Sequence, residues 1–145
     1  YWAKQSSVAA SGKLHQYSSY LQPPYRLAER ASGKPLLVFF EQKTCNDCDE
    51  LHGDILKRKE SIALLKQFDV VLLDTWADTP LQTPAGQQTT AAEWSRQLDV
   101  QYVPSMVMFD AGGKEVFRTE AYLKAFHTQA AMEYAGRLRA LREEP

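Results

Sequence analysis

Runs of consecutive hydrophobic residues predict the strands of this chain. Residues 35–40 read PLLVFF and residues 69–76 read DVVLLDTW. Such runs are typical of strands that are buried on both faces, as in a parallel sheet covered by helices. A third apolar stretch, SMVMF at residues 105–109, is followed by DAGG and then by KEVFRT. This pattern predicts a tight turn and an antiparallel return strand.

Helical patterns separate these strands. From Asp47 to about Lys59 the apolar residues recur with helical spacing, and Ser61 is placed to cap a further short helix. Thr90, with Glu93 three residues later, predicts a capping box at the start of another helix. A closing amphipathic helix is expected from about residue 122 to residue 142. Its expected buried stripe consists of Leu123, Phe126, Ala130, Tyr134 and Leu138.

Strands that alternate with helices favour parallel crossovers, so the pattern predicts an α/β domain with a mixed central sheet. Residues 1–22 have no clear period and are expected to form an arm that precedes a domain over residues 23–145. Pro24 and Gly33 suit the start and stop of a short helix. Residues 77–88, with two prolines and a glycine, predict a loop inserted before the third core helix.

Composition narrows the possible functions. The chain has 145 residues, a formal net charge of −1, 44% hydrophobic and 24% charged residues. These values fit one globular domain, and no basic run favours nucleic acid or an anionic membrane surface. No apolar run approaches the roughly 20 residues of a membrane span. The two cysteines allow at most one internal disulfide, which excludes a scaffold held together by several disulfides.

The two cysteines, Cys45 and Cys48, form a C-x-x-C motif at the predicted junction of a buried strand and a helix. A helix N-terminus carries partial positive charge and free N–H groups, which stabilise a thiolate. Cys45 is therefore expected to attack disulfides, and Cys48, one turn deeper, to resolve the mixed disulfide. The same spacing also occurs in metal sites, so the motif alone is only moderately specific.

Pro104 stands directly before the third apolar stretch and after Val103. A proline there removes one ladder N–H, and we predict a cis bond in a turn that faces the cysteines. The Val103 backbone would then be available to pair with an extended substrate segment.

These motifs resemble the thioredoxin superfamily. The resemblance rests on LLVFF, CNDC, VVLLDTW and YVPSMVMFDAGGKEV, and within the superfamily the chain looks most like periplasmic thioredoxin-related proteins of the SoxW type. It implies a thioredoxin fold and a thiol–disulfide oxidoreductase with Cys45 as attacking thiolate, Cys48 as resolving thiol and Pro104 as cis proline. It also implies protein substrates, no bound cofactor and a DsbD-type electron donor.

The chain departs from thioredoxins proper in ways that bear on its redox direction. Phe39 stands where they carry a buried acid, and Glu41 is the nearest candidate for that proton-handling role. Three further acidic residues, Asp47, Asp49 and Glu50, flank the cysteines. Negative charge disfavours a thiolate, so we expect a reductant or general exchange protein rather than a strong oxidant.

Other interpretations remain open at this point. Cys45 and Cys48 could form a static disulfide, or could join His52 in a metal site within a binding module that has no catalytic turnover. An oxidase or isomerase is the alternative among enzymes. His52 is expected to be a solvated helix residue, His15 and His127 have no partner motif, and Trp76 and Trp94 are expected in packing roles more than at a substrate groove.

The compartment and the oligomeric state are expected from the resemblance and from the start of the chain. The chain begins at Tyr1 without an initiator Met, so we expect a chain that is processed or cut by design, with any signal peptide outside this sequence. Together with the resemblance, this predicts a monomer exported to the periplasm.

Overall fold

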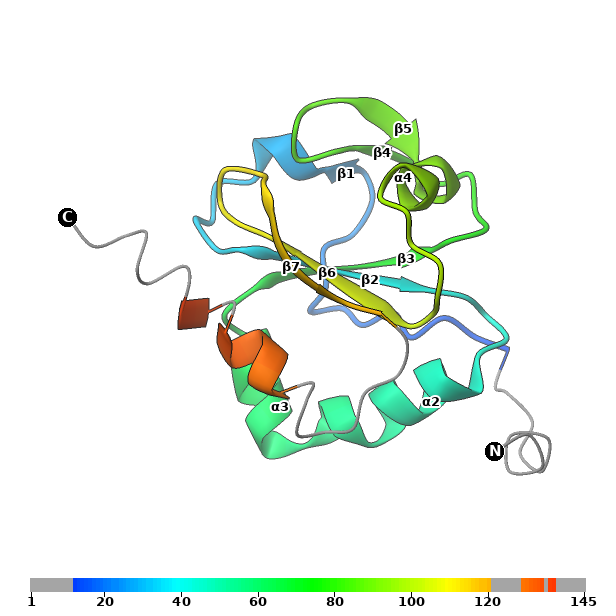
Figure 1. The fold of residues 1–145 in the computed structure, drawn as a ribbon, viewed down its shortest axis with the longest axis vertical. Coiled ribbons are helices and arrows are strands. Elements are labelled where there is room, and N and C mark those ends of the chain that lie inside the picture. Colours follow the sequence, from blue (N-terminus) through cyan, green and yellow to red (C-terminus); the bar gives the residue numbers. More distant parts are fainter. Residues whose placement is uncertain (1–11, 121–128, 135, 138–145) are drawn as a thin grey trace.

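The computed structural model describes residues 12–120, 129–134 and 136–137. At its centre lies a four-stranded sheet in the order β3-β2-β6-β7 (Figure 1). These strands are β2 (Leu36–Glu41), β3 (Asp69–Asp74), β6 (Ser105–Phe109) and β7 (Glu115–Thr119). Strand β2 runs parallel to β3 and antiparallel to β6, and β7 runs antiparallel to β6. The predicted mixed sheet is therefore confirmed.

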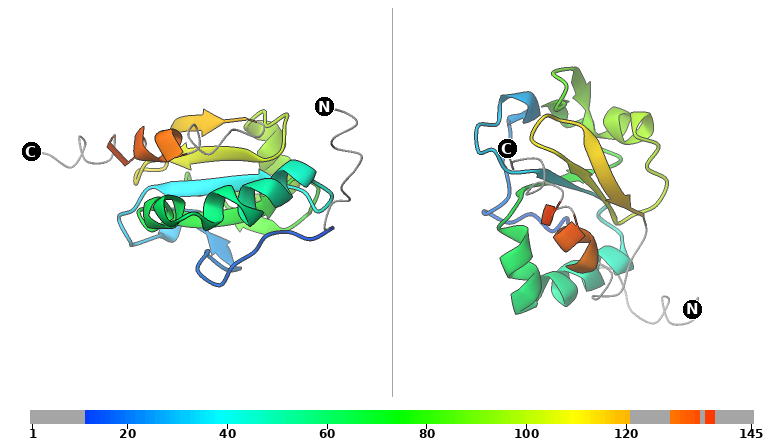
Figure 2. Two further views of the ribbon diagram at one scale, coloured as in Figure 1. Left: turned by 90° about the horizontal axis from the view of Figure 1, so that it is seen from below. Right: turned by 60° about the vertical axis from the view of Figure 1, so that its left-hand side comes forward.

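Helices cover both faces of this sheet. On one face lie α2 (Asn46–Gly53), the 3-10 helix η2 (Ile55–Lys57) and α3 (Lys59–Leu65), and on the other lies α4 (Ala91–Gln97) (Figures 1 and 2). The helix predicted over residues 47–59 is interrupted, because the backbone leaves helical geometry at Asp54, with φ −126° and ψ −69°.

Ser61 does not cap α3, contrary to the prediction. The helix already begins at Lys59, and Ser61 is buried inside it. Its hydroxyl instead accepts a hydrogen bond of 3.0 Å from the Gln129 side chain, 68 residues away in the chain. Sequence spacing does not reveal such a long-range partner.

The segment predicted as a loop over residues 77–88 contains a strand and a tight turn. Strand β4 (Pro80–Gln82) pairs antiparallel with β5 (Gln88–Thr90) and parallel with β1 (Tyr25–Arg26), which gives a second, three-stranded sheet. The Thr83 hydroxyl accepts from the Gln87 amide, and Gly86 adopts a positive φ of 93°. Strands this short have no apolar period, so the hydrophobic pattern could not predict them.

The short helix predicted after Pro24 is reduced to one turn. Strand β1 comes first and is followed by the 3-10 helix η1 (Leu27–Glu29). Gly33 lies beyond it with a positive φ of 74°, in a turn rather than at a helix end.

Strand β2 separates two hydrophobic clusters, because alternate side chains point to opposite faces. Leu37 and Phe39 pack toward α2 and α3, whereas Leu36, Val38 and Phe40 pack toward α4. The strand is therefore buried on both faces, as predicted. Glu41 continues the row of Leu37 and Phe39, so its carboxylate enters the α2 side of the sheet.

The predicted hairpin turn is confirmed, and the predicted capping box is confirmed at its N-cap half only. The Thr90 hydroxyl accepts from the Glu93 amide at 3.2 Å and caps α4, although the Glu93 carboxylate pairs with Arg96 instead of closing the box. In the hairpin between β6 and β7, an Asp110 carboxylate oxygen accepts from the Gly112 and Lys114 amides at 2.9 Å.

Residues 129–134 and 136–137 are helical. Ala131 and Met132 are buried against the cluster on the α2 side of the sheet. The predicted stripe is wrong at Ala130, which is exposed, and at Tyr134, which is 50% exposed and rests against Phe117. The other three residues of the predicted stripe, Leu123, Phe126 and Leu138, lie outside the described residues.

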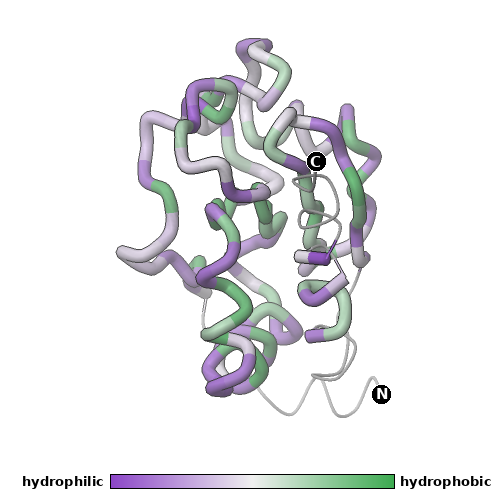
Figure 3. Tube along the Cα trace, turned by 90° about the vertical axis from the view of Figure 1, so that its left-hand side faces the viewer, coloured by the Kyte–Doolittle hydropathy of each residue, from purple (hydrophilic) through white to green (hydrophobic). Residues whose placement is uncertain are grey.

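Hydrophobic and hydrophilic residues are distributed differently between the strands and helices and the outer turns. In Figure 3 hydrophobic residues are interspersed along the strands and helices, while hydrophilic residues dominate many of the outer turns. Among the described residues, no helix combines the length and the apolar character needed to cross a bilayer.

Candidate redox site

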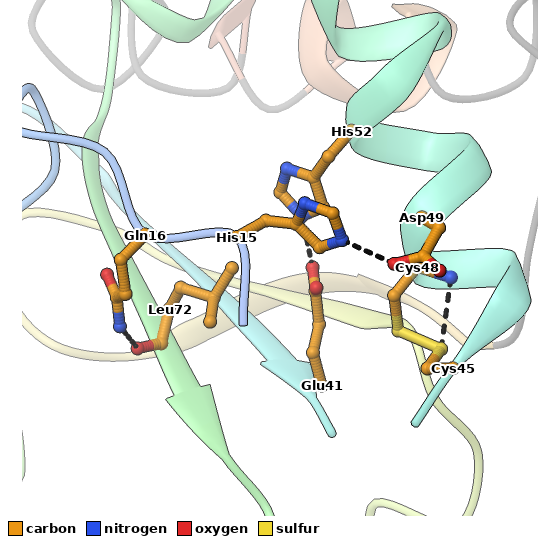
Figure 4. A network of polar contacts seen from close by, with 8 residues as sticks. All are labelled: His15, Gln16, Glu41, Cys45, Cys48, Asp49, His52 and Leu72. Carbon is orange, nitrogen blue, oxygen red and sulfur yellow. Dashed lines mark hydrogen bonds and ion pairs between the residues drawn. A yellow bond between two sulfur atoms is a disulfide. The ribbon is translucent and has the colours of Figure 1, made fainter. Parts of the chain in front are cut away.

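Cys45 and Cys48 form a disulfide at the N-terminus of α2 (Figure 4). The chain leaves β2 at Glu41 and enters the helix four residues later, with Cys45 at the N-cap in extended geometry. The Cys45 sulfur accepts a hydrogen bond of 3.0 Å from the Cys48 amide. In the reduced protein the same free helix N–H groups would stabilise negative charge on Cys45.

The two sulfurs differ in their access to solvent. Cys45 is 7% exposed, whereas Cys48 is fully buried. Cys45 is therefore the more accessible of the two cysteines.

Glu41 is a fully buried carboxylate beside this helix. One of its oxygens, Oε2, lies 2.5 Å from His52 Nε2. The alternation of β2 brings this side chain to the α2 face, since Glu41 follows Leu37 and Phe39 at intervals of two residues. The structure thus places the acid proposed from the sequence beneath the helix that carries the cysteines.

His52 is not the solvated residue that its helical position predicted, because it is fully buried. It lies four residues after Cys48 and so faces the sheet on the same side of α2. Its ring packs against the Phe39 ring with centroids 5.3 Å apart. The spacing of Cys48 and His52 could have indicated burial, but the charged partner Glu41 appears only in three dimensions.

The N-terminal arm covers this pair. The His15 ring stacks on the His52 ring with centroids 4.6 Å apart, and His15 Nε2 lies 2.8 Å from an Asp49 carboxylate oxygen (Figure 4). The Gln16 side chain donates to the Leu72 carbonyl, and the Leu21 amide donates to the Val70 carbonyl. Sequence analysis missed His15 because its partners lie more than 30 residues away.

Two tyrosines of the arm are affected by the buried acid. Burial raises the pKa of Tyr17, and the charge of Glu41 raises it further. Burial likewise raises the pKa of Tyr20, with Tyr17 and Glu41 adding to the effect. Both phenols therefore keep their protons to a higher pH than a free tyrosine does.

Val103 and Pro104 lie at the same edge of the sheet as the cysteine turn. Strand β6 begins at Ser105, which pairs with Phe40, so Pro104 lies level with the end of β2. Pro104 is buried, Val103 is partly exposed, and the peptide bond between them is cis.

The fold and the motif together can be compared with known proteins. A family model described as a thioredoxin-like domain matches residues 28–136, about three quarters of the chain. The chain belongs to the thioredoxin-like family. No curated protein matches it.

Solved structures share this thioredoxin-like fold at low sequence identity. A thioredoxin-fold protein from Helicobacter pylori is 17% identical with a TM-score of 0.66, over 78% of this chain and 75% of that one. A thioredoxin from Thermus thermophilus is 20% identical with a TM-score of 0.59, over 77% and 81% of the two chains. A DsbH oxidoreductase is 17% identical with a TM-score of 0.57, over 93% of this chain and 99% of that one.

The two tryptophans named from the sequence have different environments in this thioredoxin-like domain. Trp94 is 4% exposed and packs between Phe40 and Phe109, which confirms a core role. Trp76 is 77% exposed, so the packing role expected for it is wrong. Its indole N–H donates to the Gln42 side chain at 2.8 Å, which holds the ring just beyond the end of β2.

The contacts of Cys45, Cys48 and His52 also test the metal site that the sequence left open. The sulfurs of Cys45 and Cys48 are bonded to each other, and Nε2 of His52 contacts Glu41. Across residues 12–120 and the described helical residues that follow, no group of three or more His, Cys, Asp or Glu side chains is placed to hold a metal ion.

Proposed function

We propose that this thioredoxin-like protein is a thiol–disulfide oxidoreductase that reduces protein disulfides with Cys45 and Cys48. The observation that carries the proposal is the disulfide at the α2 N-terminus, in which Cys45 keeps 7% exposure and Cys48 has none. This asymmetry gives the two sulfurs separate roles.

The reaction starts from the dithiol form. The Cys45 thiolate attacks one sulfur of a substrate disulfide, forms a mixed disulfide and releases the other substrate sulfur as a thiolate. Cys48 then loses its proton and attacks Cys45, which breaks the bond to the substrate. The substrate gains two electrons and two protons, and the protein is left with its internal disulfide.

Cys48 is buried, so the acceptor of its proton has to come from the protein. Glu41, at the end of β2, is a buried carboxylate that faces the helix carrying both cysteines. We assign it as the acceptor of the Cys48 proton.

Val103 and Pro104 support substrate binding. Pro104 has no backbone N–H and lies level with the end of β2, while the partly exposed Val103 offers backbone groups to an extended substrate segment.

The direction of electron flow is part of the proposal. Acidic residues near the cysteines disfavour the thiolate and thus a strongly oxidising pair. Glu41 and Asp49 each contact a histidine, and Asp47 and Glu50 also lie at or near the α2 N-terminus. We therefore favour a reductant. A DsbD-type donor and a periplasmic location follow from the resemblance to SoxW-type proteins.

Two cysteine variants test the cycle. Cys45→Ser should abolish reduction of a model protein disulfide such as that of insulin, because it removes the attacking sulfur. Cys48→Ser should instead accumulate mixed disulfides, which mass spectrometry of non-reduced protein would detect. If Cys48→Ser traps nothing and both variants retain wild-type turnover, the proposed cycle is wrong.

The reduction potential tests the direction separately. Equilibration in thiol buffers should give one two-electron transition closer to about −270 mV, as in thioredoxin, than to about −120 mV, as in DsbA. A value near the second figure would indicate an oxidase and would leave the roles of the cysteines unchanged.

A further inference from the structure

The pair formed by Glu41 and His52 contains two buried polar atoms without a hydrogen-bond partner. Within the described residues, Glu41 Oε1 and His52 Nδ1 are each inaccessible to solvent and unpaired, while their other polar atoms bind each other. A buried unpaired polar atom is costly, and each such atom in a folded protein calls for an explanation.

Cys48 lies one helical turn from the histidine of this pair. Both residues are on the buried face of α2, and Glu41 contacts His52 from the adjacent strand. The structure holds the disulfide state, in which Cys48 has no S–H to donate. In the dithiol state, Cys48 regains an S–H group that can donate a hydrogen bond.

We propose that His52 is a positioning residue that orients Glu41 and shares the proton that Glu41 takes from Cys48. The inference rests on the proposed oxidoreductase function and deepens it. A buried carboxylate on its own has no neighbouring group with which to share a proton. A carboxylate paired with an imidazole can share the proton with that ring.

Transfer of the Cys48 proton to Glu41 accompanies formation of the internal disulfide. As Cys48 attacks Cys45, its S–H bond breaks and the proton goes to Glu41 Oε1, with His52 bound to Oε2. The electron pair on the Cys48 sulfur forms the new S–S bond, and the substrate sulfur leaves with the electron pair of the broken bond. By microscopic reversibility, the same pair returns the proton to Cys48 when the internal disulfide is reduced.

Titratable groups of the arm and of α2 lie around this pair. The arm contributes His15, Tyr17 and Tyr20, and α2 contributes Asp49, which is bound to His15. The His15 ring stacks on the His52 ring with centroids 4.6 Å apart, so the arm closes one side of the pair.

His52 is also among the residues that line a cavity. The cavity has a volume of about 470 Å³ and lies between the arm and the α2–α3 region, with Tyr17, Leu56 and Phe68 among its lining residues. Three lysines, Lys34, Lys57 and Lys66, also line it. Neither cysteine is among its lining residues.

A single-turnover experiment isolates the step. Reduced protein in slight excess is mixed with 5,5′-dithiobis(2-nitrobenzoate) in a stopped-flow instrument, across the neutral pH range. The first release of thionitrobenzoate reports attack by Cys45, and the second reports resolution by Cys48. The variants are His52→Gln, which keeps a donor for Glu41 but does not titrate, and His52→Phe; Asp54→Asn, an exposed change on the same helix end, is the control.

We expect the first phase to stay within about twofold in every variant. The second phase should slow at least about tenfold in His52→Gln and His52→Phe, with a changed pH profile, and should be unaffected in Asp54→Asn. Wild-type rates and pH profile for the second phase in His52→Gln would overturn the inference, since they would show that only the hydrogen bond matters.

The outcomes also separate this inference from the proposed function. If the wild-type protein shows no first phase, the oxidoreductase proposal itself fails. If both phases occur and neither depends on His52, only the role of His52 fails. Should His52→Phe not fold, as judged by unfolding of its oxidised form, His52→Gln decides the question alone.

Discussion

The rings of His15 and His52 are nearly parallel, with an interplanar angle of 9° and centroids 4.6 Å apart, although the two residues belong to different parts of the chain. His15 comes from the N-terminal arm, and His52 lies in the helix that carries the redox cysteines. The arm therefore packs against α2, and through His52 it forms part of the surroundings of Glu41.

Replacing His15 by Ala should destabilise the protein by about 1–2 kcal/mol. The change removes a ring stack, worth about 0.5–1.5 kcal/mol, and a partly exposed contact with Asp49, worth up to about 1 kcal/mol. Urea unfolding of the oxidised protein would measure the loss, with Ser18→Ala, an exposed change in the same arm, as control. Equal stability of the two variants would show that the arm contributes little.

Neutralising Asp47 should make the cysteine pair easier to reduce. Asp47 lies in the first turn of α2, where its charge opposes a thiolate on Cys45. If Asp47→Asn stabilises the reduced form by about 0.5 kcal/mol, the reduction potential rises by about 10 mV. Thiol-buffer equilibration would measure the shift, and Glu60→Gln, an exposed change in α3, should leave the potential unchanged. A lower potential in Asp47→Asn would contradict the charge argument.

The two tryptophans should differ sharply in their effect on stability. Trp94 packs between Phe40 and Phe109 in the cluster beneath α4, so Trp94→Ala should cost about 3–5 kcal/mol. Trp76→Ala removes a ring that is 77% exposed and should cost less than about 1 kcal/mol. Urea unfolding of both variants makes the comparison. A large loss for Trp76→Ala would indicate that its bond to Gln42 organises the end of β2.

Local patterns in the sequence predicted the main sheet and the cysteine turn because each depends on neighbouring residues. The hydrophobic run at residues 36–40 is long enough to predict a doubly buried strand, and Thr90 lies three residues from the amide it caps. The position of the C-x-x-C motif between that strand and a helix followed from the same patterns.

What the sequence could not predict depends on partners that are distant in the chain. His52 carries a titratable group, so composition favoured an exposed position, whereas Glu41 and the ring of Phe39 make burial possible. The strand β4 was missed because three residues cannot show a period, and its pairing with β1 joins segments about 55 residues apart.

Alkaline pH should weaken the fold through Tyr20. Burial, Tyr17 and the charge of Glu41 raise its pKa above the ordinary value of about 10. Below about pH 10 the phenol is neutral in both the folded and the unfolded states. Above it the unfolded state loses the proton first, so the free energy of unfolding falls as pH rises, by up to about 1.4 kcal/mol per pH unit from this group until the folded-state pKa is reached.

Tyr20→Phe removes that contribution and should flatten the decline above about pH 10, although Tyr17 and Tyr25, whose pKa values burial also raises, will keep part of it. Urea unfolding at about pH 9, 10 and 11 would measure the slopes, and Tyr102→Phe, at a position that is 57% exposed, is the matched control. A slope in Tyr20→Phe equal to that of the wild type would mean that other groups account for the alkaline loss. A flatter slope confined to Tyr20→Phe would show that the phenol packed beside Glu41 limits stability at high pH.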